Sequence, residues 1–113
     1  MFKPLLLPHF LKQLREYGKK YFHLETAVHE TLTTFQKDRA ILIRPHVYKI
    51  RLRSPDIRRG KSKSFRLIVL IVHYETYLVP VVLYFKGDQR DISKRELIEY
   101  LKITVKELKA YKA

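Results

Sequence analysis

The sequence predicts an α+β domain in which a small antiparallel β-sheet packs against an N-terminal helical hairpin and is followed by a C-terminal helix. Two observations predict this class: apolar residues recur every three or four positions near both ends of the chain, and every two positions in its middle. A chain of 113 residues is long enough for one core and too short for two. Residues 1–113 are therefore expected to form a single domain with the element order α-α-β-β-β-α.

Two helices are predicted in the first third of the chain. After Pro8, which suits the first turn of a helix, apolar residues recur at helical spacing as far as Tyr17, and Gly18 ends the pattern. A second stripe of the same kind predicts a helix from about Leu24 to Asp38. Because only a short link separates the two helices, they are expected to form a hairpin that covers one face of the sheet.

The end of the chain is also predicted to be helical. Ser93 and Glu96 have the spacing of a capping box, in which each side chain accepts a hydrogen bond from the other residue's backbone N–H. Thr104 and Glu107 repeat this spacing. The prediction is therefore one helix with a break or two short helices.

From residue 47 the spacing of apolar residues changes to two, which is typical of a β-strand with one buried face. The buried face is expected to carry Tyr48, Ile50 and Leu52. The opposite face then carries three cations about 6.6 Å apart, namely Lys49, Arg51 and Arg53.

Residues 67–85 form an apolar stretch with one formal charge, at Glu75. Its length approaches that of a membrane span, but the central charge, the many β-branched residues and Pro80 all disfavour a membrane helix. Two buried strands that fold back near Glu75 are predicted instead. Since proline lacks the N–H that a central strand donates, Pro80 predicts an edge position or a bulge.

Positive charge is concentrated in the middle of the chain. The sequence has 24 Lys and Arg against 11 Asp and Glu, a net charge of +13, and residues 44–66 hold nine of these bases with Asp56 as their one acid. Such an excess predicts a polyanionic partner, which is a nucleic acid, an acidic protein or an anionic membrane. Cations of the predicted loop 54–63 are expected to contact phosphates or an acidic partner: Arg58, Arg59, Lys61 and Lys63.

The composition disfavours several kinds of site. The chain has no cysteine, its five histidines lack the spacing of metal ligands, and its three glycines cannot build a phosphate-binding loop. No metal ion or cofactor is therefore expected, and the absence of cysteine suits a reducing cytoplasm. Asp88 and Asp91 lie in a polar stretch and are expected to be turn and cap residues.

Cations combined with tyrosines suit the cleavage of RNA without a metal ion. This reaction needs a base for the 2′-hydroxyl proton, cations for the charge that develops around phosphorus, and an acid for the leaving 5′-oxygen. Clustered Lys and Arg side chains can supply the cations, and a lysine among arginines has a lowered proton affinity that suits a base.

Three segments between residue 47 and about residue 98 follow a recognisable pattern: VYKIRL, then GKSKSFRLIVLI, then TYLVPVVLYFKGDQRDIS. A Val-Tyr-Lys strand, a Gly-Lys-Ser segment leading to Phe-Arg, and a Tyr-x-Lys-x-acid segment occur in this order in the RelE/HigB group of the RelE/ParE toxin superfamily, which the sequence resembles. The sequence departs from the family pattern at Lys63-Ser64, where the family has two glycines, and at Gly87, where its best-studied branch has an arginine.

The resemblance implies the toxin of a toxin–antitoxin pair, a cytoplasmic endoribonuclease that cleaves mRNA in the decoding site of the ribosome. It implies an acidic antitoxin as the second partner and no membrane. Five residues occupy positions that the family uses for catalysis: Lys49, Arg51, Arg66, Tyr84 and Lys86. Arg53 and Arg90 join the loop cations as expected RNA contacts, and Arg90 is a candidate replacement for the arginine missing at Gly87.

Two alternatives stay open at this point. The first is a ParE-like toxin that poisons DNA gyrase through protein contacts, against which the retained catalytic positions weigh. The second is a basic module that binds RNA or the ribosome without catalysis, which the departure at Gly87 favours. The sequence also leaves open which of its lysines and tyrosines would act as the general base.

Overall fold

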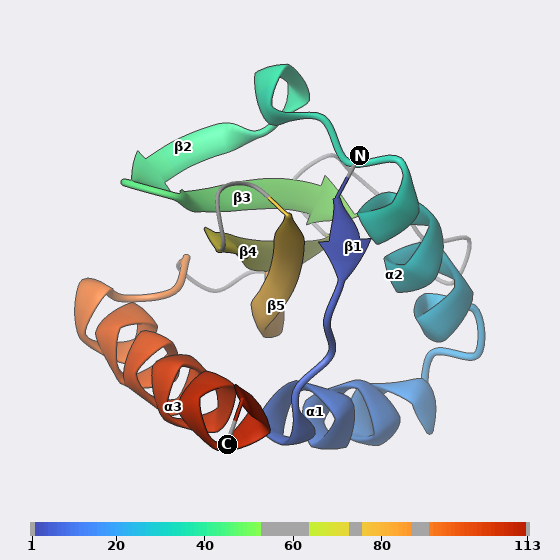
Figure 1. Cartoon of the computed structure of the whole chain (residues 1–113). Helices are drawn as coiled ribbons and strands as arrows, with labels where there is room; N and C mark the ends of the chain where they lie inside the picture. Colours follow the sequence, from blue (N-terminus) through green and yellow to red (C-terminus); the bar gives the residue numbers. More distant parts are fainter. Residues whose placement is uncertain (1, 53–63, 73–75, 87–90, 113) are drawn as a thin grey trace.

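In the described part of the chain, five β-strands form one mixed sheet with helices on both of its faces (Figure 1). The computed structural model describes residues 2–52, 64–72, 76–86 and 91–112. The strands are β1 (Lys3–Pro4), β2 (Ile41–Arg44), β3 (Val47–Leu52), β4 (Ser64–Val72) and β5 (Tyr77–Lys86), and the helices are α1 (Pro8–Gly18), α2 (Leu24–Thr33) and α3 (Lys94–Lys112), with a 3₁₀ turn, η1 (Lys37–Arg39). The order in the sheet is β1-β5-β4-β3-β2. The predicted α+β class is confirmed.

The sheet is larger than the sequence predicts. β3, β4 and β5 pair antiparallel, as expected, but one further strand lies on each side of them. β2 pairs antiparallel with β3 across a tight turn in which His46 adopts φ 66°. β1 pairs in parallel with β5, which makes the sheet mixed. The prediction of three strands was wrong because strands of two and four residues are too short to show a period.

Helix α2 ends at Thr33 and not at Asp38, so its predicted length was wrong. The hydroxyls of Thr33 and Thr34 both donate to the carbonyl oxygen of Glu30, at 3.1 and 2.7 Å, and compete there with the backbone ladder. Gln36 then adopts an extended conformation, with φ −135° and ψ 129°. The apolar stripe alone could not reveal this local competition.

Helix α3 runs without a break, so the predicted interruption was wrong. The first capping box is confirmed, because Ser93 Oγ accepts the Glu96 N–H at 3.1 Å and Glu96 Oε1 accepts the Ser93 N–H at 3.2 Å. The second predicted capping box, between Thr104 and Glu107, does not form. The buried Thr104 hydroxyl donates instead to the Tyr100 carbonyl one turn earlier, at 2.8 Å.

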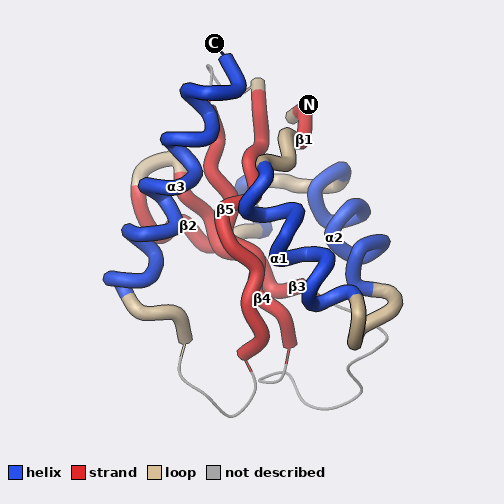
Figure 2. The backbone as a smooth tube through the Cα atoms, turned by 90° about the horizontal axis from the view of Figure 1, so that it is seen from below, coloured by secondary structure: helices blue, strands red, loops and turns tan. Residues whose placement is uncertain are grey.

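Helices α1 and α2 lie on one face of the sheet and α3 lies on the other (Figure 2). A separate group of buried side chains packs on each face. The apolar stripes of α1 and α2 cover one face, as predicted, and α3 covers part of the other face through Leu97. The first group contains Phe65 of β4. Its ring makes edge-to-face contacts at centroid distances of 5.1, 5.0 and 5.3 Å with Tyr17, Tyr21 and Phe85, respectively.

The apolar stretch 67–85 forms two antiparallel strands, as predicted, with Val72 opposite Tyr77 at the closed end. Glu75, the expected turning point, lies outside the described residues. No helix in the described part of the chain is both long enough and apolar enough to span a membrane.

Pro80 lies at a β-bulge, which confirms one of the two positions predicted for it. Val69 is opposite Pro80, whereas the preceding residue of β4, Ile68, is opposite Val82. Val81 is therefore an extra residue in β5. Consecutive valines at 81 and 82 both contact the group of buried residues beneath α3, although neighbours in a regular strand face opposite sides.

Side chains of α1 bond the edge of β5 beyond the short strand β1. The carbonyl oxygen of the bulged Val81 lies 2.7 Å from His9 Nε2, and the N–H of Leu83 donates to Gln13 Oε1 at 2.6 Å. Buried backbone groups left without these partners would destabilise the fold. Strand β1 pairs only with the first residues of β5, and side chains of α1 bond the backbone groups further along the same edge of β5.

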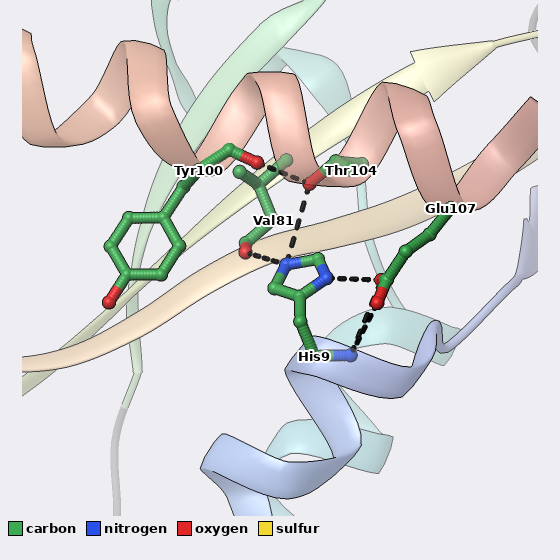
Figure 3. A network of polar contacts seen from close by, with 5 residues as sticks. All are labelled: His9, Val81, Tyr100, Thr104 and Glu107. Atoms are coloured by element: carbon green, nitrogen blue, oxygen red, sulfur yellow. Dashed lines mark hydrogen bonds and ion pairs between the residues drawn. The ribbon is translucent and has the colours of Figure 1, made fainter.

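His9 also joins α1 to α3 (Figure 3). Its Nδ1 lies 2.5 Å from Glu107 Oε1, and its backbone N–H donates to Glu107 Oε2 at 3.1 Å. Leu7 at the N-cap offers no side-chain hydrogen bond, so Glu107 acts as the cap from another helix. Both ring nitrogens of His9 contact oxygen atoms, which makes this residue a structural junction of α1, β5 and α3.

Candidate functional site

The five predicted catalytic residues lie on one face of three neighbouring strands. Arg51, Arg66 and Tyr84 form a row across β3, β4 and β5, because each is directly opposite the next. Directly opposed residues of antiparallel strands point to the same face. Lys49 and Lys86 share this face, since their partners on β4 are two residues to either side of Arg66. We call this set the cationic face: Lys49, Arg51, Arg66, Tyr84 and Lys86.

The alternation predicted for the first strand is confirmed in its described part. Tyr48, Ile50 and Leu52 pack with the buried group beneath α1 and α2, which leaves Lys49 and Arg51 on the opposite side. The third predicted cation of the row, Arg53, lies outside the described residues.

The bulge in β5 decides that Tyr84 belongs to the cationic face. Counted from the pair of Val72 with Tyr77, a regular ladder would place Leu83 opposite Arg66 and turn Tyr84 towards the other side of the sheet. The extra residue shifts the register by one. Tyr84 therefore lies opposite Arg66, and Lys86 lies opposite Ser64.

Asp91 connects two members of the cationic face. Its Oδ2 accepts a hydrogen bond from Lys49 Nζ at 2.7 Å, and its Oδ1 accepts one from the hydroxyl of Tyr84 and another, at 3.0 Å, from the N–H of Ile92. The expectation that Asp91 is a turn or cap residue was wrong, because Ser93 caps α3. The position of Asp91 just before the capping box was visible in the sequence, but that position does not indicate which strands the carboxylate would contact.

These contacts fix the protonation of Tyr84 and Asp91. Burial raises the pKa of Tyr84, the hydrogen bond to the Asp91 carboxylate raises it further, and the Arg66 charge opposes this only weakly. Burial would also raise the pKa of Asp91, but the hydrogen bonds from Lys49 and Tyr84 outweigh it and lower that pKa to about 2. At neutral pH Tyr84 is therefore a hydrogen-bond donor and Asp91 is an anion.

Arg66 is a buried cation, with 5% of its surface exposed. Its Nη1 donates to the Ser64 hydroxyl and, at 3.4 Å, to the Ser64 carbonyl oxygen. Among the described residues no carboxylate forms an ion pair with it. A charge held in this way attracts an anion more strongly than a solvated surface arginine does. Ser64, which orients the guanidinium, was not recognised as part of the site from the sequence.

The remaining predicted RNA contacts lie outside the described residues: Arg58, Arg59, Lys61, Lys63 and Arg90. In the part of the chain that is described, His, Asp and Glu side chains form no group of three that could hold a metal ion. The described part of the site consequently consists of four cations, one phenol, one carboxylate and the Ser64 hydroxyl, on the strands β3, β4 and β5 and the segment before α3.

Comparison of the sequence with profiles of known protein families and with curated proteins found no match. The chemistry of the cationic face is therefore the basis for inferring a function.

Proposed function

We propose that the protein is a metal-independent endoribonuclease, a toxin of the RelE/HigB type that cleaves mRNA in the decoding site of the ribosome. The observation that carries this proposal is the row formed by Arg51, Arg66 and Tyr84, with Lys49 and Lys86 on the same face. Such a row presents several cations and one neutral hydroxyl to a single phosphate. The cytoplasm is the compartment that this activity requires.

The proposed reaction is an internal transfer at phosphorus. The 2′-oxygen of the RNA forms a bond to phosphorus and loses its proton to a base, while the bond from phosphorus to the 5′-oxygen breaks and that oxygen gains a proton. Arg66 and Arg51 stabilise the negative charge that develops on the phosphate oxygens. The neutral phenol of Tyr84 is suited to donate a hydrogen bond and unsuited to be the base. Lys49 forms an ion pair with Asp91, which leaves Lys86 as the candidate for the base.

A site of this kind benefits from a substrate that is already held in place. The ribosome fixes the conformation of mRNA in the decoding site, so the protein itself needs to supply only charge and proton transfer. The net charge of +13 favours association with an RNA-rich particle.

An acidic antitoxin is the second partner that we propose. A groove of about 430 Å³ between the end of β2 and α3 combines cations with apolar side chains. Its lining includes Arg44, Lys102, Lys106 and Lys109 together with Leu101 and Val105. An amphipathic segment with acidic side chains along one edge fits this combination.

Primer extension on a defined mRNA tests the proposed activity, with purified protein in the presence and absence of programmed ribosomes. New 3′ ends that appear only with ribosomes are expected. Cleavage of naked RNA would retain the nuclease and reject its dependence on the ribosome. If RNA is bound but not cut in either reaction, the non-catalytic RNA-binding module is correct, and inhibition of DNA gyrase without RNA cleavage would identify the ParE-like alternative.

A further inference from the structure

The negatively charged carboxylate of Asp91 lies where a phosphate of the proposed RNA substrate would bind. Its carboxylate contacts Lys49 at 2.7 Å and accepts the hydroxyl hydrogen of Tyr84. An ammonium group and a hydroxyl group both donate hydrogen bonds to the oxygen atoms of a phosphate, as they do to those of a carboxylate. No other described carboxylate contacts a member of the cationic face.

We infer that Asp91 is an internal competitor for this anion site, and that binding of an RNA phosphate displaces its carboxylate from Lys49 and Tyr84. The inference rests on the proposed function, because it takes an RNA phosphodiester as the ligand. Asp91 thereby acts as a positioning residue: it holds the two donors in place before RNA arrives and releases them to the substrate.

Lys49 and Tyr84 lie on paired strands, whereas Asp91 does not, and this difference allows a phosphate to replace the Asp91 carboxylate. Lys49 and Tyr84 belong to β3 and β5, whose backbones are fixed by pairing with β4. Asp91 belongs to no helix or strand, and 35% of its side chain is exposed. Its carboxylate can therefore turn to water by rotation about its side-chain bonds while the two donors keep their positions.

An RNA phosphate can contact more cations of the cationic face than Asp91 does, which favours displacement of Asp91 by RNA. Asp91 forms an ion pair with Lys49 and none with Arg66. A phosphate placed between these cations interacts with both, and neighbouring phosphates of the same RNA add further contacts. A small free anion lacks those additional contacts and therefore binds more weakly than RNA. Displacing Asp91 costs both ligands the same free energy, so loss of its charge should tighten the binding of both by the same factor.

The variant Asp91→Asn tests this inference, with Asp38→Asn as the matched control. Asp38 lies in the exposed turn η1, so its variant loses the same charge by the same chemical change away from the site. The probes are inorganic phosphate and a 2′-O-methyl RNA oligonucleotide, which cannot be cleaved, at one ionic strength. Both probes should bind about tenfold more tightly to Asp91→Asn than to the wild type. Asp38→Asn should bind them like the wild type.

The outcomes separate this inference from the proposed function. If Asp91 only fastens the start of α3 to the sheet, Asp91→Asn will unfold at lower urea concentration and bind the probes no more tightly, which overturns the inference. Tighter binding by Asp91→Asn with no cleavage by any variant on ribosomes would keep the inference and reject the nuclease. Unchanged binding with intact cleavage would reject the inference alone.

A measurement on the wild type covers the case in which Asp91→Asn does not fold. Saturating 2′-O-methyl RNA should shift the carboxyl ¹³C resonance of Asp91 and the ring ¹³Cζ resonance of Tyr84 together. If both resonances stay in place at saturation, the carboxylate is not displaced and the inference is wrong.

Discussion

Arg66 and Tyr84 lie directly opposite each other on β4 and β5, on the face of the sheet that α3 partly covers. The two side chains differ in what they contact: Arg66 bonds Ser64 on its own strand, whereas Tyr84 bonds Asp91 beyond the end of β5. The pair therefore combines a buried permanent cation with a hydroxyl that remains protonated. This combination suits a site that stabilises charge on a phosphate, and five predictions follow from it and from the packing that supports it.

Replacing Arg66 should reduce RNA cleavage without unfolding the protein. Arg66→Lys keeps the charge but loses the planar group of donors, and removal of one such donor typically lowers the rate of an enzyme about 100-fold or more. Arg66→Ala should reduce cleavage further, as measured by primer extension. Arg15→Ala, at an exposed position of α1, is the control and should cleave like the wild type. Persistent cleavage and toxicity in Arg66→Ala would show that this arginine is not catalytic.

Tyr84 should ionise at unusually high pH. Burial and the bond to Asp91 raise its pKa above the usual 10.0, so the fold stabilises the neutral phenol. This stabilisation is complete below pH 10.0 and is lost as the pH rises through the higher pKa of the folded state. The ultraviolet titration of the wild type minus that of Tyr84→Phe isolates this residue. A difference curve that begins at the usual pH would contradict the contact with Asp91.

Asp91 should contribute to stability at neutral pH and lose this contribution in acid. Its pKa is lowered from 3.8 to about 2 by Lys49 and Tyr84 against the effect of burial, so folding favours the carboxylate. The contribution is present above pH 3.8 and disappears as the pH falls to about 2. Urea unfolding across this range should show a steeper loss for the wild type than for Asp91→Asn. Parallel curves would exclude a lowered pKa.

Glu107 should matter for stability more than another glutamate of the same helix. Glu107→Gln weakens the contacts to the ring and the backbone N–H of His9, and loss of such bonds costs about 1–3 kcal/mol in the free energy of unfolding. The control is Glu99→Gln, whose side chain is exposed and lies 3.6 Å from Lys102. That control should change stability by less than about 0.5 kcal/mol. Equal effects of the two variants would mean that the junction with His9 is not stabilising.

Truncation of Phe65 should destabilise the fold strongly. This residue is fully buried and contacts three other aromatic rings, so Phe65→Ala should lower the free energy of unfolding by about 3–5 kcal/mol. Phe22→Ala removes the same group from a position that is 81% exposed and should have little effect. Urea unfolding compares the two variants, and similar midpoints would show that Phe65 is not central to the core.

The sequence predicted the parts of this fold that depend on local pattern. The first helix ends at Gly18 as expected, the capping box at Ser93 and Glu96 forms, and the alternation from residue 47 assigns Lys49 and Arg51 to one face. Each of these follows from neighbours within a few positions. The end of α2 and the continuity of α3 were predicted wrongly because hydroxyls of threonine bond carbonyls within the helix, a choice that apolar spacing does not reveal.

Charge and alternation are local properties of the chain, so the residues that could form an anion site can be read from the amino-acid sequence alone. Which of these residues come into contact depends on the folded sheet. The bulge at Val81 turns Tyr84 towards Arg66, and its carbonyl oxygen finds a partner in His9 of α1, more than seventy positions away. Asp91 reaches Lys49 across 42 positions. Contacts between residues this far apart in the sequence depend on strand register and on packing, and both are fixed only when the whole sheet has formed.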